Sequence, residues 1–197
     1  AQSGTGLEDL LGAFGYTAYT DFYNEQDGTV RVFLDDTSTL RLNASGLVHY
    51  ASTDGSATVS AYDESDITDA AALDAQLDCA RLILDAAQRA GDTDTHASLY
   101  AVERSGEQTT LIFLQMYSGV PVLGDADFAT FVFDGSALRT ATIRLQKFQP
   151  TGGKRTVMPA KQAAAGASGA ERGLMAAYRA QDGQYVPSRF YLKNAAE

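Results

Sequence analysis

The stretch Leu111–Gln149, LIFLQMYSGVPVLGDADFATFVFDGSALRTATIRLQKFQ, decides the fold of this chain. Its first part, Leu111–Tyr117, is a run of strand-forming residues, and Ser118-Gly119 then turns the chain. An extended conformation resumes at Val120-Pro121-Val122, because proline favours this conformation for the residue before it. This order predicts a strand, a tight turn and a second, short strand.

The second part of the same stretch predicts a β-hairpin. Phe128–Phe133 and Leu138–Lys147 are both strand-like, and Asp134-Gly135 lies between them. An Asp-Gly pair suits a tight hairpin turn because both positions accept a positive φ. We therefore expect three adjacent antiparallel strands in the middle of a sheet, with the rest of the chain arranged around them.

Upstream of this stretch, a short helix is followed by a series of strands. Leu7, Leu10, Leu11 and Phe14 have the i, i+3, i+4, i+7 spacing of one apolar helix face, and Gly15 is placed to end the helix. Residues 1–62 are thus predicted to form a small helix-plus-meander unit. The predicted strands are Ala18–Asn24 with Thr29–Asp35, Thr39–Asn43 with Leu47–Ala51, and Ala57–Ala61.

A long helix is predicted after this unit. Asp63–Asp69, DESDITD, gathers acidic residues ahead of an Ala/Leu-rich segment, where carboxylates complement the positive end of a helix dipole. Apolar residues at helical spacing then continue almost to Gly91. We predict a helix over 67–90 that Gly91 ends and that packs against the sheet.

The remaining elements complete an α+β fold with antiparallel sheet. We expect a strand at Ala97–Arg104 paired with Gln108–Tyr117, a short helix starting at Pro159, and a final hairpin of Glu171–Gln181 and Tyr185–Lys193. The connections between strands are too short for parallel crossovers. We predict two units: residues 1–62, and residues 63–197 with the order helix, hairpin, hairpin, helix, hairpin.

Composition excludes several classes of protein. With 45% hydrophobic residues, the 197-residue chain can build a core, yet no window approaches the roughly 18 consecutive apolar residues of a membrane span. The single cysteine, Cys79, rules out an internal disulfide. The chain starts without a methionine or a basic-then-apolar leader, so we expect that a signal peptide or membrane anchor preceded it.

Charge is distributed unevenly along the chain. Residues 1–146 contain 7 arginines, no lysine and 22 acids, a net charge of −15, whereas residues 147–197 contain 8 bases and 3 acids, a net charge of +5. Such asymmetry favours two faces with different partners, or two halves that attract each other. Because the chain lacks a concentrated positive face for phosphate groups, we do not expect it to bind nucleic acid.

Sequence patterns of catalysis and metal binding are missing. The chain has no HExxH, GxGxxG or GxxxxGK motif, and neither His49 nor His96 has a sequence partner that would make it a base or a ligand. Cys79 lies beside the apolar stripe of the long helix, so we interpret it as a small core residue. We predict no enzymatic activity, no catalytic residue, no metal site and no cofactor.

Two segments resemble a known group of families. Phe113–Val122, FLQMYSGVPV, resembles the F-x-Q-x-Y-x-G-x-P-V/I pattern of YycH/YycI-type extracytoplasmic regulators and, more loosely, of PepSY domains and thermolysin-like protease propeptides. Leu174–Arg179 with Tyr185–Phe190 resembles their terminal hairpin, although Phe190 stands where those families usually have tryptophan. The resemblance covers about residues 67–193 and implies a PepSY/YycI-like fold. Its motif positions, which we expect to serve structure or interaction, are Gln115, Tyr117, Gly119, Val120, Pro121, Tyr178, Tyr185 and Pro187.

The resemblance also implies a non-enzymatic regulatory function. YycH/YycI-type proteins are anchored outside the membrane of Gram-positive bacteria by one N-terminal helix, and they restrain a sensor histidine kinase of a two-component system. We therefore expect an extracytoplasmic, membrane-anchored protein whose partner is a membrane sensor kinase. Sheet edges and apolar patches would make the contact.

Two alternatives remain open at this point. The PepSY likeness also allows an inhibitor or propeptide-type domain that acts on a secreted peptidase. A small hydrolase or ligand-binding protein would need a deep pocket that joins His49 or His96 to a carboxylate. A solid core between helix 67–90 and the sheet would count against this last alternative.

Overall fold

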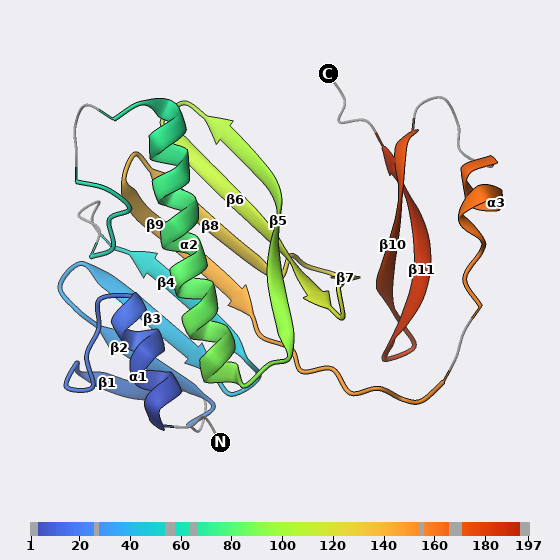
Figure 1. Ribbon diagram of the computed structural model, residues 1–197. Coiled ribbons are helices and arrows are strands. Elements are labelled where there is room, and N and C mark those ends of the chain that lie inside the picture. The colour runs from blue at the N-terminus through green and yellow to red at the C-terminus, as the bar shows by residue number, and fades with distance from the viewer. Residues whose placement is uncertain are drawn as a thin grey trace.

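The computed structural model of the chain describes residues 4–25, 28–53, 58–63, 67–153, 156–165 and 171–193. Figure 1 shows helices on one side of a large sheet and a β-hairpin at the C-terminal side of the molecule. In chain order the elements are α1 (Gly4–Ala13), β1 (Phe22–Glu25), β2 (Val30–Leu34), β3 (Ser38–Asn43), β4 (Leu47–Ser52), α2 (Asp69–Gly91), β5 (Thr95–Ser105), β6 (Gln108–Tyr117), β7 (Val120–Leu123), β8 (Ala129–Asp134), β9 (Ala137–Arg144), α3 (Ala160–Ala165), β10 (Glu171–Gln181) and β11 (Gln184–Lys193).

The described strands form one 11-stranded sheet. Eight of them pair antiparallel in the order β1-β2-β3-β4-β9-β8-β6-β5, which we call the main sheet. The sheet continues from β6 through β7 to β10 and β11, and β7 pairs parallel with β10, contrary to the expectation of antiparallel pairs alone. The predicted α+β class with antiparallel sheet is confirmed. The three adjacent strands expected from the opening stretch are β6, β8 and β9, which pair in that order near the middle of the sheet.

The sheet has an internal symmetry that the sequence does not reveal. Helix α1 precedes the strands β1 to β4, and helix α2 precedes β5, β6, β8 and β9, so a helix and four meandering strands occur twice. The last strands of the two sets, β4 and β9, pair antiparallel at the centre. The predicted division into residues 1–62 and 63–197 stays a prediction, since a shared sheet does not decide it.

Helices α1 and α2 lie on the same face of this sheet (Figure 1). Ile83 and Leu84 of α2 are buried in one cluster with Phe131 of β8 and Leu138 of β9, and Phe14 after α1 stacks on Tyr50 of β4 with 5.1 Å between the ring centroids. The space between α2 and the sheet is therefore filled by side chains, which disfavours a deep active-site pocket there.

The ends of α2 follow capping rules, with one correction to the prediction. Thr68 caps the N-terminus, because its side chain accepts a hydrogen bond from the Ala71 amide. We predicted that Gly91 ends the helix, but Gly91 is its last residue and Asp92 takes the left-handed conformation with φ 48°. Gly91 instead provides space: an added Cβ would lie 3.1 Å from Leu145 Cδ1.

Two strand predictions in the first unit need correction. The strand predicted over Ala18–Asn24 begins only at Phe22, because Thr17 and Thr20 hydrogen-bond to each other in a turn. The described part of the predicted strand Ala57–Ala61 is not a strand; Ser60 forms a single bridge with Ala137. Residues 54–57 lie outside the described residues.

A polar network anchored by Asp35 closes the turn between β2 and β3. The carboxylate accepts hydrogen bonds from the amides of Thr37 and Ser38, at 2.8 and 2.6 Å, and from the hydroxyls of Ser38 and Thr58. Buried Ser38 also contacts the Tyr16 hydroxyl at 2.6 Å. Partial burial by itself raises the pKa of Asp35, but these hydrogen bonds together outweigh it and hold the pKa below the ordinary value.

This network predicts a stability contribution that depends on pH. Because its folded-state pKa is lowered, Asp35 stabilises the fold above the unfolded-state pKa of about 4, and the contribution is lost as pH falls through the folded-state pKa. We expect Asp35→Asn to lower the free energy of unfolding by about 1 kcal/mol at neutral pH, and by less in acid. Denaturant unfolding of both proteins, at neutral pH and in acid, measures this difference. Asp36→Asn is the control, because no described hydrogen bond involves its exposed carboxylate; equal effects of the two variants would contradict the prediction.

Gly46 is a second point on which the sheet centre depends. Gly46 lies in the turn that connects β3 to β4 and has φ +93°. Its carbonyl accepts a hydrogen bond from the Leu145 amide at 2.9 Å. A Cβ added at Gly46 would overlap the Leu145 carbonyl oxygen. We expect Gly46→Ala to destabilise the protein by more than about 3 kcal/mol, from backbone strain and steric overlap. Gly28→Ala is the matched control, since Gly28 has φ +85° but an added Cβ there meets nothing within 4 Å. Similar unfolding free energies for the two variants would show that the overlap does not matter.

Candidate functional site

The β10–β11 hairpin stands beside the end of the main sheet and is reached through the segment 145–159 (Figure 1). Strand β10 joins β7 through two parallel residue pairs, Tyr178 with Val122 and Arg179 with Leu123. The two segments that carry the family-like motif, Phe113–Val122 and Leu174–Arg179 with Tyr185–Phe190, therefore meet where β10 pairs with β7. We call this place the junction.

Four aromatic side chains from separate elements gather at the junction. Tyr117 at the end of β6 lies 6.1 Å from Tyr178 of β10 and 5.8 Å from Phe148, measured between ring centroids. Phe148 in turn lies 5.1 Å from Tyr185 of β11. All three contacts have edge-to-face geometry, which favours aromatic attraction, and all four rings remain partly exposed.

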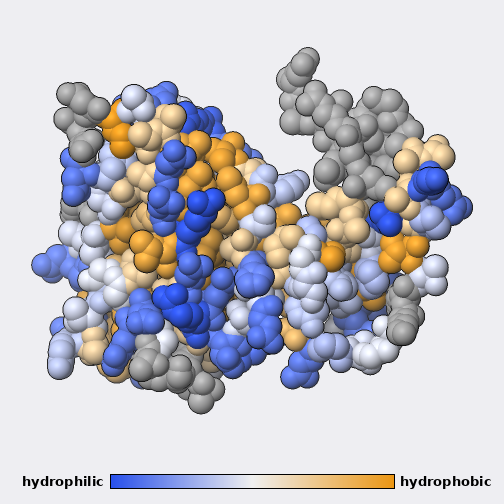
Figure 2. All heavy atoms as spheres, viewed as in Figure 1, coloured by the Kyte–Doolittle hydropathy of each residue, from blue (hydrophilic) through white to orange (hydrophobic). Residues whose placement is uncertain are grey.

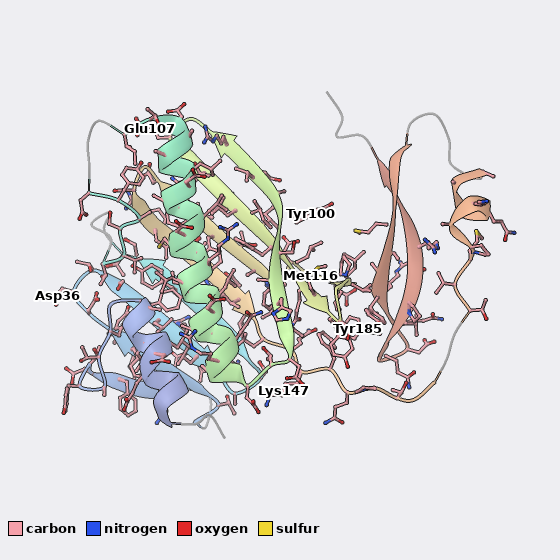
Figure 3. All side chains as sticks on the ribbon, viewed as in Figure 1. Asp36, Tyr100, Glu107, Met116, Lys147 and Tyr185 are labelled. Atoms are coloured by element: carbon pink, nitrogen blue, oxygen red, sulfur yellow. The ribbon has the colours of Figure 1, made fainter. Side chains whose placement is uncertain are left out.

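Two glutamine side chains tie this aromatic cluster to the sheet. Gln115 is 2% exposed, and its amide donates to Thr95 Oγ1 at 2.9 Å and to the Gln146 carbonyl at 3.0 Å. The Tyr185 hydroxyl donates to Gln146 Oε1 at 2.9 Å. Figure 3 places Tyr185 between the end of the main sheet and the hairpin. Because Gln115 satisfies groups on both sides of β6, it fixes the chain where the hairpin attaches.

A cavity of about 190 Å³ opens beside these residues. Its lining combines apolar side chains with Gln115, Gln146, Tyr185 and the two charged residues Asp125 and Arg144. Arg144 also donates to the Asp127 carbonyl at 3.0 Å. The cavity is small, and most of its groups are suited to hydrogen bonding and ring packing.

The remaining motif positions shape the turn next to the cluster. Ser118 and Gly119 both have positive φ, 49° and 76°, as a tight hairpin turn requires, and an added Cβ at Gly119 meets nothing within 4 Å. Val120 and Pro121 then pair with Tyr117 and Met116, as a short strand. On the hairpin, exposed Pro187 lies opposite Tyr178.

The structure thus brings Gln115, Tyr117, Tyr178 and Tyr185 together, and places Gly119, Val120, Pro121 and Pro187 in the adjacent turn and strands. Their role in interaction stays a prediction. Sequence reasoning missed Phe148 and Gln146, which complete the cluster. The signal was an aromatic residue between the polar residues Lys147 and Gln149, just after the last predicted strand of the sheet.

His49 lies on β4, and His96 lies on β5, where it pairs with Met116 of β6 beside the junction. His49 is partly buried on β4 with Nδ1 3.1 Å from Thr142 Oγ1, and burial, then Arg41 and Arg144, lower its pKa. His96 borders a surface depression with Asp85, Arg89 and Asp92, but Arg89 and Asp92 are paired with Asp9 and Lys147. Neither histidine forms an ion pair with a carboxylate in the described part of the chain.

Cys79 is also a poor candidate nucleophile. It is partly buried, packs against the core, and borders a groove of about 520 Å³ between α1 and α2. Burial raises the pKa of its thiol to about 11, so the thiolate is scarce at neutral pH.

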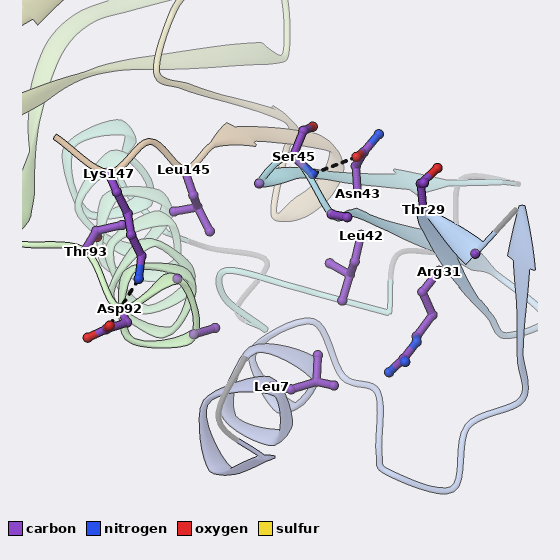
Figure 4. A pocket seen from close by; sticks show the side chains of 15 residues that line it. Leu7, Thr29, Arg31, Leu42, Asn43, Ser45, Asp92, Thr93, Leu145 and Lys147 are labelled. Atoms are coloured by element: carbon purple, nitrogen blue, oxygen red, sulfur yellow. Dashed lines mark hydrogen bonds and ion pairs between the residues drawn. The ribbon is translucent and has the colours of Figure 1, made fainter. Parts of the chain in front are cut away.

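A cavity of about 610 Å³ lies beside Leu145 and Lys147, which follow β9 (Figure 4). Leu7, Leu42 and Leu145 contribute apolar lining, Arg31 stands at one end, and Lys147 stands at the other. The Lys147 amine is neutralised by Asp92 at 3.1 Å, and Arg31 lies over the Phe22 ring. Lys147 and Arg31 therefore each already have a partner within the protein.

Two searches of the described residues give negative results. They contain no group of three or more His, Cys, Asp or Glu side chains that could hold a metal ion. No helix within the same ranges is both long and apolar enough to span a membrane.

Comparison with known proteins supports a fold relationship. No family model and no curated protein sequence matches the chain. Among solved structures, the Bacillus megaterium YpeB C-terminal domain is similar, with a TM-score of 0.53 and 10% sequence identity over 98% of this chain and 88% of that chain. This likeness supports a fold related to PepSY domains, and it does not single out the YycH/YycI type.

Proposed function

We propose that this protein is a non-enzymatic, extracytoplasmic interaction domain that binds a protein partner at the junction between the main sheet and the β10–β11 hairpin. The observation that carries the proposal is the convergence of Tyr117, Phe148, Tyr178 and Tyr185, four partly exposed rings from three parts of the chain. Aromatic side chains held in place by neighbours are the most frequent anchors of protein interfaces, because they bury a large area at little entropic cost.

The surroundings of the rings favour binding over catalysis. Gln115 and Gln146 hold the rings through neutral hydrogen bonds. The charged lining residues of the neighbouring cavity are Asp125 and Arg144, and Arg144 donates to the Asp127 carbonyl. A surface made mainly of rings and neutral hydrogen-bonding groups supplies adhesion and specificity.

For the partner, we propose a membrane sensor histidine kinase of a two-component system in a Gram-positive bacterium, with an upstream anchor that keeps both proteins at the same membrane. The resemblance of the Phe113–Val122 segment to YycH/YycI-type regulators supports this choice. Shared anchoring would raise the local concentration of the partner, so that a small contact would be sufficient.

A PepSY-like inhibitor or propeptide-type domain acting on a secreted peptidase is the second candidate. It is favoured by the fold likeness to the YpeB C-terminal domain, which is compatible with PepSY relatives in general.

A photo-cross-linking experiment distinguishes these candidates. A photoreactive phenylalanine replaces Tyr185 in the full-length protein, which is expressed in the cells that normally make it. We expect a cross-link to a membrane sensor kinase. A cross-link to a secreted peptidase would favour the second candidate, and absence of both would reject the junction as the binding site. The same photoreactive residue in place of Tyr19, which is 95% exposed and remote from the junction, is the control.

The affinity of the identified partner provides a quantitative test. Tyr185→Ala removes the ring contact with Phe148 and the hydrogen bond to Gln146, so we expect binding to weaken by about tenfold or more, or roughly 1.4 kcal/mol. Tyr19→Ala should leave the affinity unchanged. Thermal unfolding of both variants shows whether a loss of binding reflects a loss of fold.

A further inference from the structure

Strand β5 is a long edge strand with one side open. It has 11 residues and pairs with β6, and no other described strand pairs with it. Backbone N–H and C=O groups on its outer side therefore have no strand partner, and an edge of this kind can pair with another chain. The edge strand at the opposite end of the main sheet, β1, has 4 residues and therefore offers a much shorter run of backbone groups for pairing.

Apolar side chains line the helix side of this edge. Leu99 pairs with Phe113 and Val102 pairs with Leu111, and both partners are buried in the core beneath α2. Because paired residues share a face of the sheet, Leu99 and Val102 project to the same side as α2. Both nevertheless remain exposed, at 38% and 37%. Figure 2 shows an apolar surface over β5 and β6, beside the hydrophilic outer face of α2.

A β-bulge divides the edge into two regular runs. The irregularity lies between Leu99 and Ala101, so Tyr100 is the extra residue and is exposed. Figure 3 places Tyr100 at the outer side of β5. The run on either side of the bulge can pair with an added strand, whose side chains would pack against Tyr100.

The charges around this edge are predominantly negative. Residues 69–107, which include α2 and β5, contain 8 acids and 3 arginines. All three arginines are already paired with carboxylates: Arg81 with Asp78, Arg89 with Asp9, and Arg104 with Asp69. Five carboxylates of this segment have no ion pair in the described structure: Asp74, Asp85, Asp94, Glu103 and Glu107. This imbalance favours a positively charged occupant.

We propose that the outer edge of β5 binds an extended, basic segment of a partner protein as an additional β-strand. Backbone hydrogen bonds to β5 provide the pairing, alternate apolar side chains of the segment cover Leu99 and Val102, and its lysines and arginines face the unpaired carboxylates of α2 and the β5–β6 turn. The edge and the junction are separate surfaces, so either proposal can fail without the other.

Synthetic peptides test the proposal on the intact chain. The probe is a fluorescently labelled peptide of alternating lysine and valine, as long as β5, and its binding is followed by anisotropy. We expect saturable binding that weakens as ionic strength rises. A lysine–glycine peptide of the same charge and length should bind at least about tenfold more weakly, because it lacks the strand preference and the apolar contacts. Equal binding of the two peptides would reduce the effect to unspecific charge attraction and overturn the proposal.

A matched pair of variants locates the site. Leu99→Lys places a charge on the β5 surface, whereas Leu34→Lys makes the same change at a side chain of nearly equal exposure on β2, 40% against 38%. We expect the first to weaken peptide binding by about tenfold and the second by less than about twofold. Hydrogen exchange should show new protection of β5 amides in the complex. Protection elsewhere, no binding, or equal effects of the two variants would contradict the proposal.

Discussion

The antiparallel pairing of β4 with β9 is the interaction on which the rest of the structure depends. Five residue pairs, from Leu47 with Arg144 to Ala51 with Thr140, join the strands that end the two helix-and-meander sets. Without this pairing, each set would have one more open edge and a half-covered core. The turn at Gly46 and the Leu145 backbone extend the same contact to the start of the linker, so the position of the hairpin also depends on it.

Local signals were sufficient to predict most elements. The 3.6-residue apolar period of α2 and the hairpin of β8 and β9 depend on neighbours in the sequence, which is why both elements are confirmed. The turn of this hairpin was predicted one residue too early: Asp134 still pairs with Ala137, so Gly135 and Ser136 form the turn. The end of α2 shows where such rules fail. Gly91 was predicted to end the helix through its backbone conformation, but it is the last helical residue. Its small size instead leaves room for Leu145, which lies far along the chain. The turn at Thr17–Thr20 replaced a predicted strand because side-chain hydrogen bonds competed with the sheet.

Long-range contacts were not predictable from the sequence. The Asp35 network joins residues from three separate segments, and nothing in their spacing reveals it. Four residues of the candidate site, Gln115, Tyr117, Tyr178 and Tyr185, were found because they belong to a familiar motif, whereas Phe148 and Gln146 belong to none. The proposed binding function rests on the same long-range contacts, since the rings of the junction come from separate parts of the chain.

The linker between β9 and α3 has a physical consequence for the docked hairpin. Two parallel residue pairs and a few rings would hold two separate molecules together only weakly, but residues 145–159 keep the hairpin permanently near its docking strand. The tether acts as a high effective concentration, set by its length and stiffness, and Pro150 and the Gly152-Gly153 pair influence both. Docking of the hairpin is thus a unimolecular process, whose equilibrium constant depends on the length and stiffness of the linker as well as on the contacts that its own Gln146 and Phe148 make.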